Sequence, residues 1–181
     1  MKCIYTNACS VVGKMDELRY LAQNEEPNII GISETWANET ISDAELHIEG
    51  YTLFRKDRKS KTQSKGGGVA LYVKETLRSR QSSTMDANQF DESVWCRVDF
   101  ADTSLLVGVC YRSPTSSDDN NDKLVDLLRI AVEESRGSQL LLMGDFNYPE
   151  INYDDYTVAA GEDSPPSIFL LVLRICSYFS T

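Results

Sequence analysis

A carboxylate and a carboxamide stand two residues apart at the end of a short apolar run. The run covers residues 139–143, and Gly144 separates it from Asp145 and Asn147. A continuous apolar stretch of this length predicts a buried strand, and residues two apart on a strand point the same way. Asp145 and Asn147 should therefore face one pocket, with Phe146 packed behind them. A carboxylate that takes a proton from water, beside an amide that donates to a phosphoryl oxygen, suits phosphate-ester chemistry. A core strand that ends in an Asp/Asn turn is the alternative.

Other predicted apolar strands also end in polar residues. Asn7 follows residues 3–6, Glu34 follows residues 28–33, and Tyr111 with Arg112 follows residues 105–110. A glutamate is costly to bury unless it is paired or bound to a cation, so Glu34 is either a metal ligand or the first solvated residue. Polar groups at the ends of several apolar strands are typical of an α/β protein whose site lies at one edge of its sheet.

The composition is that of one soluble globular domain. The chain has 181 residues, 41% of them hydrophobic, and a mean hydropathy of −0.33. The N-terminus lacks the apolar core of a signal peptide, so we expect an intracellular protein, nuclear or cytoplasmic, without a membrane segment. One histidine, His47, and five cysteines without a C-x-x-C pair exclude a disulfide framework, a zinc site and a Ser-His-Asp triad. We expect reduced, mostly buried thiols and a surface position for His47.

The net charge of −10 is unusual for a protein that handles nucleic acid, but the basic residues are clustered. Six of the 18 lysines and arginines lie between Arg55 and Lys65. Charges beyond a Debye length of about 8 Å are largely screened, so this local cluster matters more than the net charge. The run is either a nucleic-acid contact or a solvated loop. Residues 66–68 are three glycines, which can bring amides close to a phosphate or form a flexible turn or bulge.

Periodicity predicts alternating strands and helices. The stretch 51–111 carries four strands without a long helix and reads as a meandering sheet. Helices are expected at 14–23, ended by Pro27, at 122–134, and after residue 165. The fold class is therefore α/β.

Four motifs, in this order, resemble the endonuclease/exonuclease/phosphatase superfamily, and more narrowly the apurinic-type endonuclease domain that precedes the reverse transcriptase in non-LTR (LINE-like) retrotransposons. They are Thr6-Asn7-Ala8, Ser33-Glu34-Thr35-Trp36, Tyr111-Arg112-Ser113-Pro114 and Gly144-Asp145-Phe146-Asn147. The resemblance covers residues 1 to about 165. It implies a DNase I-like, four-layer αββα sandwich that cuts a DNA phosphodiester with Mg²⁺ or Mn²⁺, and a reverse transcriptase domain in the intact element.

The resemblance also implies a role for each site residue. Glu34 would hold the metal, assisted by Asn7, and Asp145 would orient or deprotonate the attacking water. Asn147 would hold the scissile phosphate, and Tyr111 would donate to the charge that develops on it. Arg112 and Arg58 would contact the phosphate.

The sequence departs from the family near its end. The family's later Asp and its closing Ser-Asp-His are missing, so residues 1–165 are expected to form an incomplete domain and residues 166–181 a divergent or truncated apolar tail. We expect activity near background and an unpaired sheet edge, because the last strands are missing. A small-phosphoester or phosphoinositide phosphatase and a non-catalytic relic or binding module are the alternatives.

Overall fold

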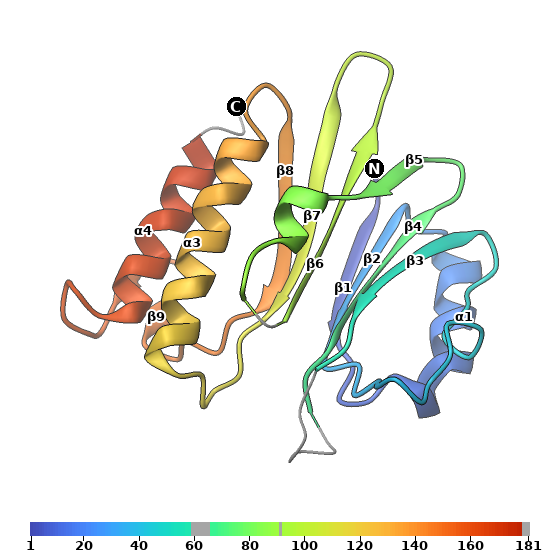
Figure 1. The fold of residues 1–181 in the computed structure, drawn as a ribbon, viewed down its shortest axis with the longest axis horizontal. Coiled ribbons are helices and arrows are strands. Elements are labelled where there is room, and N and C mark those ends of the chain that lie inside the picture. Colours follow the sequence, from blue (N-terminus) through green and yellow to red (C-terminus); the bar gives the residue numbers. More distant parts are fainter. Residues whose placement is uncertain (59–65, 91, 179–181) are drawn as a thin grey trace.

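The computed structural model describes residues 1–58, 66–90 and 92–178, with side chains up to residue 173. Two four-stranded sheets pack face to face, with α1 outside the first sheet and α3 and α4 outside the second (Figure 1). The predicted four-layer αββα sandwich is confirmed.

The first sheet has the strand order β1-β2-β4-β3. Its strands are β1 (Cys3–Asn7), β2 (Ile29–Ser33), β3 (Tyr51–Lys56) and β4 (Val69–Lys74). β1 and β2 are parallel and are joined by a 3-10 turn, η1 (Val12–Lys14), and by α1 (Met15–Glu25). Met15, Leu18 and Ala22 form the buried stripe of α1, the helix predicted for residues 14–23.

The second sheet has the order β5-β6-β7-β8. Its strands are β5 (Arg78–Gln81), β6 (Ser93–Asp99), β7 (Ser104–Tyr111) and β8 (Gln139–Asp145), and α2 (Ser83–Asp86) lies between β5 and β6. α3 (Asp118–Glu134) joins the parallel pair β7 and β8. The single meandering sheet expected for residues 51–111 is wrong, because β3 and β4 belong to the first sheet. Alternation along a strand shows which side chains are buried but not which sheet the strand joins.

Gly31 lets the two sheets approach each other directly behind the ends of β2 and β8. A Cβ at Gly31 would lie 2.9 Å from Cε of Met143 and 2.9 Å from Cγ2 of Val109. A side chain at this position would force Met143 and Val109 to shift, three residues before Glu34. The absence of a side chain at Gly31 therefore allows the two sheets to pack closely near the strand tips.

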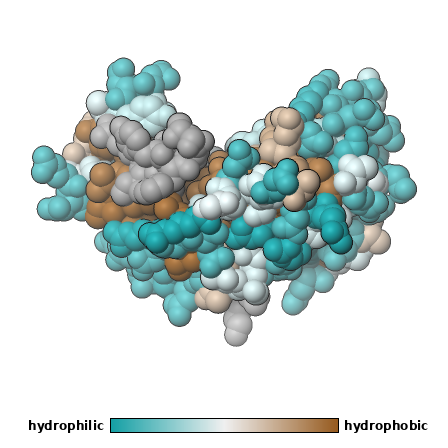
Figure 2. All heavy atoms as spheres, turned by 90° about the horizontal axis from the view of Figure 1, so that it is seen from above, coloured by the Kyte–Doolittle hydropathy of each residue, from teal (hydrophilic) through white to brown (hydrophobic). Residues whose placement is uncertain are grey.

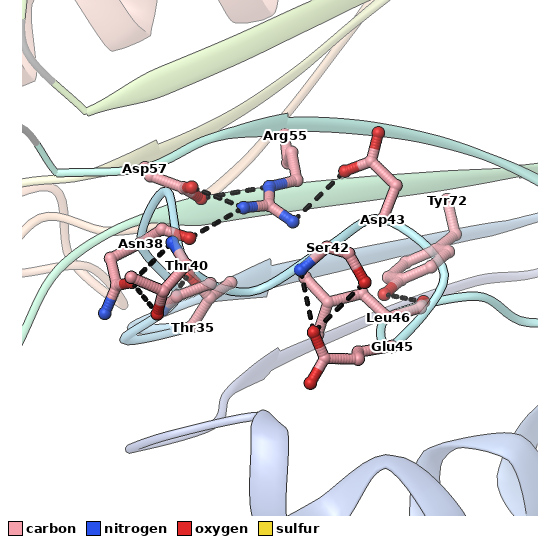
Figure 3. A network of polar contacts seen from close by, with 11 residues as sticks. Thr35, Asn38, Thr40, Ser42, Asp43, Glu45, Leu46, Arg55, Asp57 and Tyr72 are labelled. Carbon is pink, nitrogen blue, oxygen red and sulfur yellow. Dashed lines mark hydrogen bonds and ion pairs between the residues drawn. The ribbon is translucent and has the colours of Figure 1, made fainter.

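The long connection between β2 and β3 is held by a polar network (Figure 3). Arg55 donates to Asp57 Oδ1 at 3.1 Å, to Asp43 Oδ1 at 3.1 Å and to the carbonyl of Asn38 at 3.2 Å. This residue of the predicted basic run is therefore neutralised by two acids. The run extends to Lys65, and its part from residue 59 lies outside the described residues.

The helix predicted after residue 165 is present as α4 (Pro165–Tyr178). Phe169 is fully buried, and its ring centroid lies 4.7 Å from that of Phe146 and 5.0 Å from that of Tyr148. At least as far as Val172, the segment expected to be a divergent or truncated apolar tail packs against the core of the second sheet. None of the helices in the described part of the chain is long and apolar enough to cross a membrane.

Two strand edges are open on the same side of the sandwich. Among the described residues, neither β1 nor β8 has a strand on its outer side. Residues 140–142 are three leucines that stay partly exposed along β8. Viewed from above, the molecule has a hollow between two raised flanks, with hydrophobic side chains on both flanks (Figure 2).

Minor expectations are also settled by the fold. His47 is a surface residue, with 55% of its side chain exposed. Of the cysteines in the described part of the chain, Cys3 and Cys9 are exposed, and Cys96 and Cys110 are buried. The expectation of mostly buried thiols was therefore half right.

Replacing Phe169 with Ala should lower the free energy of unfolding by about 3–5 kcal/mol, because it leaves a cavity between α4 and the rings of Phe146 and Tyr148. Urea unfolding followed by circular dichroism measures this. Leu171 lies on the exposed face of α4, with 58% of the residue exposed. Leu171→Ala is therefore the matched control and should change the free energy of unfolding by no more than about 0.5 kcal/mol. Equal losses in the two variants would contradict the packing of α4.

Candidate active site

Four strand tips meet at one end of the sandwich, the lower end in Figure 1. In each parallel pair the carboxyl ends lie side by side, since Asn7 pairs with Ser33 and Tyr111 pairs with Asp145. Glu34 follows Ser33 directly. The structure therefore brings together Asn7, Glu34, Tyr111 and Asp145, which lie far apart in the sequence.

Asn7 lies at the centre of this group. Its Nδ2 donates to Glu34 Oε1 at 3.0 Å and to Asp145 Oδ2 at 2.9 Å. Its Oδ1 accepts from the backbone N–H of Cys9 at 3.2 Å, which determines the direction of the amide. One side chain thus bridges two carboxylates that belong to different sheets.

Glu34 is held by several donors at once. Its φ of +52° turns the chain sharply after β2, and the indole Nε1 of Trp36 donates to Oε2 at 3.1 Å. Partial burial alone would raise the pKa of Glu34, but hydrogen bonds from Asn7, Trp36 and Tyr111 outweigh it, so the pKa is lowered. Glu34 is therefore an anion at neutral pH.

Tyr111 supplies a proton donor to the same centre. Only 6% of the residue is exposed, and burial, followed by the hydrogen bond to Glu34, raises the pKa of its phenol far above neutrality. The hydroxyl therefore keeps its proton over the physiological range. The hydroxyl can donate its hydrogen bond to Glu34 or, instead, to an oxyanion that forms on a bound substrate.

Arg58 stands behind Tyr111 and is held by an acid that the sequence did not single out. Its Nε donates to Glu92 Oε1 at 2.8 Å, and its guanidinium carbon lies 5.8 Å from the centroid of the Tyr111 ring. Glu92 is 5% exposed and also accepts from Gly68 N at 2.7 Å. A Cβ at Gly67 would lie 2.0 Å from Glu92 Oε1. These glycines therefore form a tight turn around an ion pair, which favours the turn alternative over a phosphate loop.

Asn147 reaches the site by a different route from the one expected. β8 ends at Asp145, and the φ of +48° at Asn147 is left-handed, so strand alternation does not place these two side chains. Instead, the N–H of Asn147 donates to Asp145 Oδ1 at 3.3 Å, and its Nδ2 donates to the carbonyl of Arg112 at 2.7 Å. A left-handed turn after the strand keeps both side chains on the same side.

Arg112, expected as a phosphate contact, lies behind the site. It is 7% exposed, and its Nε donates to Asn121 Oδ1 at 2.8 Å. Its Nη1 donates to the carbonyl of Asn147 at 2.8 Å, and its guanidinium covers the Tyr148 ring at 4.0 Å. The described geometry makes Arg112 a clamp on the 145–148 turn.

Sequence reasoning missed Tyr5 and Trp36 as parts of the site. The Tyr5 hydroxyl lies 2.7 Å from Ser33 Oγ, and burial, with smaller effects that include the charges of Asp145 and Glu34, raises the pKa of Tyr5 to about 12. Its position two residues before Asn7 on one strand could have shown that both point the same way. Trp36 offered no comparable signal, because its contact with Glu34 depends on a turn.

The donor set fits a magnesium-like cation and not zinc. Within residues 1–58, 66–90 and 92–178 no group of three or more His, Cys, Asp or Glu side chains could hold a metal. Zn²⁺ requires such a group, whereas Mg²⁺ keeps several waters and uses one or two carboxylates. Glu34 is the residue that could hold the ion. Asn7 turns its NH₂ group toward the carboxylates, which makes it an anchor for Glu34 in this structure.

Comparisons with known proteins agree with this geometry. The sequence matches the model of the Endonuclease/Exonuclease/phosphatase family over residues 4–168, while a search of curated proteins found no match. Among solved structures, the chain is similar to the AP endonuclease LMAP from Leishmania major, with 13% identity, 96% of this chain covered and a TM-score of 0.66. It is also similar to the endonuclease domain of TRAS1, a telomere-specific non-LTR retrotransposon, with 14% identity, 96% coverage and a TM-score of 0.64.

A third similar structure is the 3′ phosphatase NExo from Neisseria bound to a product DNA hairpin, with 15% identity, 97% of this chain covered and a TM-score of 0.63. At these identities the likeness establishes the fold. The chain spans 65% of the Leishmania structure and 71% of each of the other two.

Asn7→Ala should raise the pKa of Glu34, because the charged form loses a hydrogen-bond donor and no amide remains between Glu34 and Asp145. Trp36 fluorescence reports the titration, since its indole donates to Glu34. The wild-type midpoint should lie below the ordinary value of 4.5 and move upward in the variant. Ionised Glu34 therefore stabilises the fold above pH 4.5, and this contribution is lost as the pH falls through the folded-state pKa.

Two controls belong to this titration. Thr6→Ala, an exposed neighbour on β1, should leave the midpoint unchanged, and Trp36→Phe should remove the signal, because the other tryptophan, Trp95, is fully buried. A midpoint that does not move in Asn7→Ala would contradict the bridging role of the amide.

Proposed function

The chain belongs to the Endonuclease/Exonuclease/phosphatase family, and from this premise we propose that it is a metal-dependent phosphodiesterase that nicks DNA, as the endonuclease domain of a retroelement. The observation that carries the proposal is the Asn7 amide, which holds the Glu34 and Asp145 carboxylates together beside the Tyr111 phenol. A structural Asp/Asn turn alone would not collect two acidic side chains and a protonated phenol in one place.

Each side chain has a distinct part in the proposed reaction. Glu34 would hold Mg²⁺ or Mn²⁺ in a largely hydrated shell, and that cation would neutralise charge on the phosphoryl oxygens. Asp145 orients the attacking water and accepts its proton. Tyr111 donates to the developing oxyanion. Asn7 bridges the two carboxylates and fixes their orientation.

Asn147 and Arg58 contribute to phosphate binding in this proposal. The NH₂ group of Asn147 has two hydrogens, and the carbonyl of Arg112 takes one of them, so the second can reach a phosphate oxygen. Arg58 provides positive potential near Tyr111 and Glu34, although Glu92 offsets much of it. Arg112 keeps a structural task.

DNA is favoured as the substrate because the similar structures include a retrotransposon endonuclease and a phosphatase bound to a DNA hairpin. In this proposal a reverse transcriptase domain is the partner in the intact element. A small phosphoester remains the second candidate. Among the described residues, Arg58 is the guanidinium close to Glu34 and Tyr111, and it is paired with Glu92. This is little positive charge for binding a duplex backbone, which favours the smaller substrate.

We expect these 181 residues to hydrolyse a phosphodiester slowly. His47, the single histidine of the sequence, lies near Tyr51, which pairs with Lys74 at the opposite end of the first sheet from Glu34. No imidazole of this sequence can therefore assist the phosphate. Loss of one stabilising donor typically costs about 10² to 10³ in rate.

The test is relaxation of supercoiled plasmid by the purified chain with Mg²⁺, beside hydrolysis of a nitrophenyl phosphodiester. Asp145→Asn should remove the slow Mg²⁺-stimulated nicking of the wild-type chain, because the water loses its base. Glu34→Gln should abolish the dependence on Mg²⁺. Glu17→Gln, an exposed acid on α1, is the matched control and should behave as wild type.

Mg²⁺-stimulated nicking that is equal in Asp145→Asn and in wild type would refute catalysis at this site. Turnover of the nitrophenyl ester without nicking would reassign the substrate to small phosphoesters.

A further inference from the structure

A short hairpin directly after the site displays two tyrosines. Its strands are β9 (Ile151–Asn152) and β10 (Thr157–Val158), and the four residues between them begin with Tyr153 and end with Tyr156. These residues are 45% and 47% exposed, among the few large hydrophobic side chains exposed to this degree in the described part of the chain. An exposed aromatic pair beside a site needs a reason.

The turn between the two tyrosines is ordered by its own side chains. Oδ1 of Asn152 accepts from the backbone N–H groups of Asp154 at 3.0 Å and Asp155 at 3.3 Å. Tyr156 has a left-handed φ of +52°, which a non-glycine residue adopts only when its surroundings require it. The rings are therefore presented on a preformed frame, which reduces the entropy lost on binding.

The hairpin shares one open groove of about 1010 Å³ with the β8 side of the proposed site. Asp145 and Asn147 line it, as do Tyr153 and Tyr156. Burial raises the pKa of Tyr153, and the charge of Asp145 is among the further causes, which is consistent with their proximity. A strand with its phosphodiester at Asp145 must carry the adjoining nucleoside into this groove.

The charges of the segment determine what the groove can recognise. Residues 148–160 contain three acids and no lysine or arginine, so the hairpin is unsuited to holding phosphates. Tyrosine rings, in contrast, stack on any nucleobase, because every base has a π-face. Bases in a duplex are already stacked and hidden, so the accessible ones are unpaired.

We propose that Tyr153 and Tyr156 stack on unpaired bases next to the phosphodiester held at Asp145 and Asn147. This inference rests on the proposed function and defines its substrate class as single-stranded or locally unpaired DNA. The hairpin then binds exposed bases by stacking, while the residues at the ends of the strands hydrolyse the DNA backbone.

The experiment measures binding of a labelled 12-nucleotide single strand, and of the same strand in a duplex, by the whole chain. We expect tighter binding of the single strand. Tyr153→Ala and Tyr156→Ala should each weaken it about 10-fold, and Tyr153→Phe should retain it, because stacking needs only the ring. Tyr20→Ala, a 70% exposed tyrosine on α1, is the matched control and should bind as wild type.

Two readouts separate stacking from a general loss of structure or charge. A 2-aminopurine base in the single strand should be quenched by wild type and not by Tyr153→Ala. The salt dependence of binding should be the same in both, because no phosphate contact is removed. A steeper or shallower salt slope in Tyr153→Ala would overturn the inference.

Equal single-strand affinity in Tyr153→Ala, Tyr156→Ala and Tyr20→Ala also overturns the inference, as does a wild-type chain that binds no single strand. These results are independent of the catalytic proposal. Asp145-dependent nicking with tyrosine-independent binding would leave the phosphodiesterase standing. Tyrosine-dependent binding without any nicking would leave the stacking hairpin standing and reject the catalysis.

Discussion

One amide nitrogen joins the two halves of the sandwich at the site. Nδ2 of Asn7, on the first sheet, donates to Glu34 of the same sheet and to Asp145 of the second. Without a donor between them, two partly buried carboxylates would repel each other and one would take up a proton. Gly31 lies three residues before Glu34, and its missing side chain lets β2 pack against Met143 and Val109 of the second sheet. The two sheets are therefore closely packed directly behind the bridge.

The arrangement of charge around the bridge explains how an acidic chain can form such a site. The two arginines nearest to it are occupied by the protein itself: Arg58 pairs with Glu92, and Arg112 binds Asn121 and the carbonyl of Asn147. They shape the turns that hold Tyr111 and Asn147. In the proposed function, attraction of a phosphate would therefore fall to a cation held by Glu34 and to neutral donors.

Beyond the bridge, the fold leaves one side open. β1 and β8 are both edge strands in the described part of the chain, and the groove along them runs from the leucines of β8 to the tyrosines of the 151–158 hairpin. An apolar groove that ends at a polar centre suits a ligand with a charged backbone and flat, uncharged side groups. In the proposals made above, base recognition and phosphodiester hydrolysis would occupy neighbouring parts of one surface.

Much of this could be predicted from the sequence. The strands, their polar ends and the buried stripe of α1 follow from local periodicity, which backbone geometry imposes on every few residues. The motif residues Asn7, Glu34, Tyr111 and Asp145 were found in the same way, because each follows an apolar run. Their meeting required the four-layer fold, which the resemblance supplied.

Only the tertiary structure decided how these residues are used. Asn7 and Asp145 are 138 residues apart, and the direction of the Asn7 amide depends on a turn at Cys9. The division of residues 51–111 between two sheets, the burial of Arg112 and the pairing of Arg58 with Glu92 also depend on distant partners. Local patterns report whether a side chain is buried, but the identity of its partner is a property of the packed chain, since hydrogen bonds and ion pairs act over a few ångströms in space irrespective of separation in sequence.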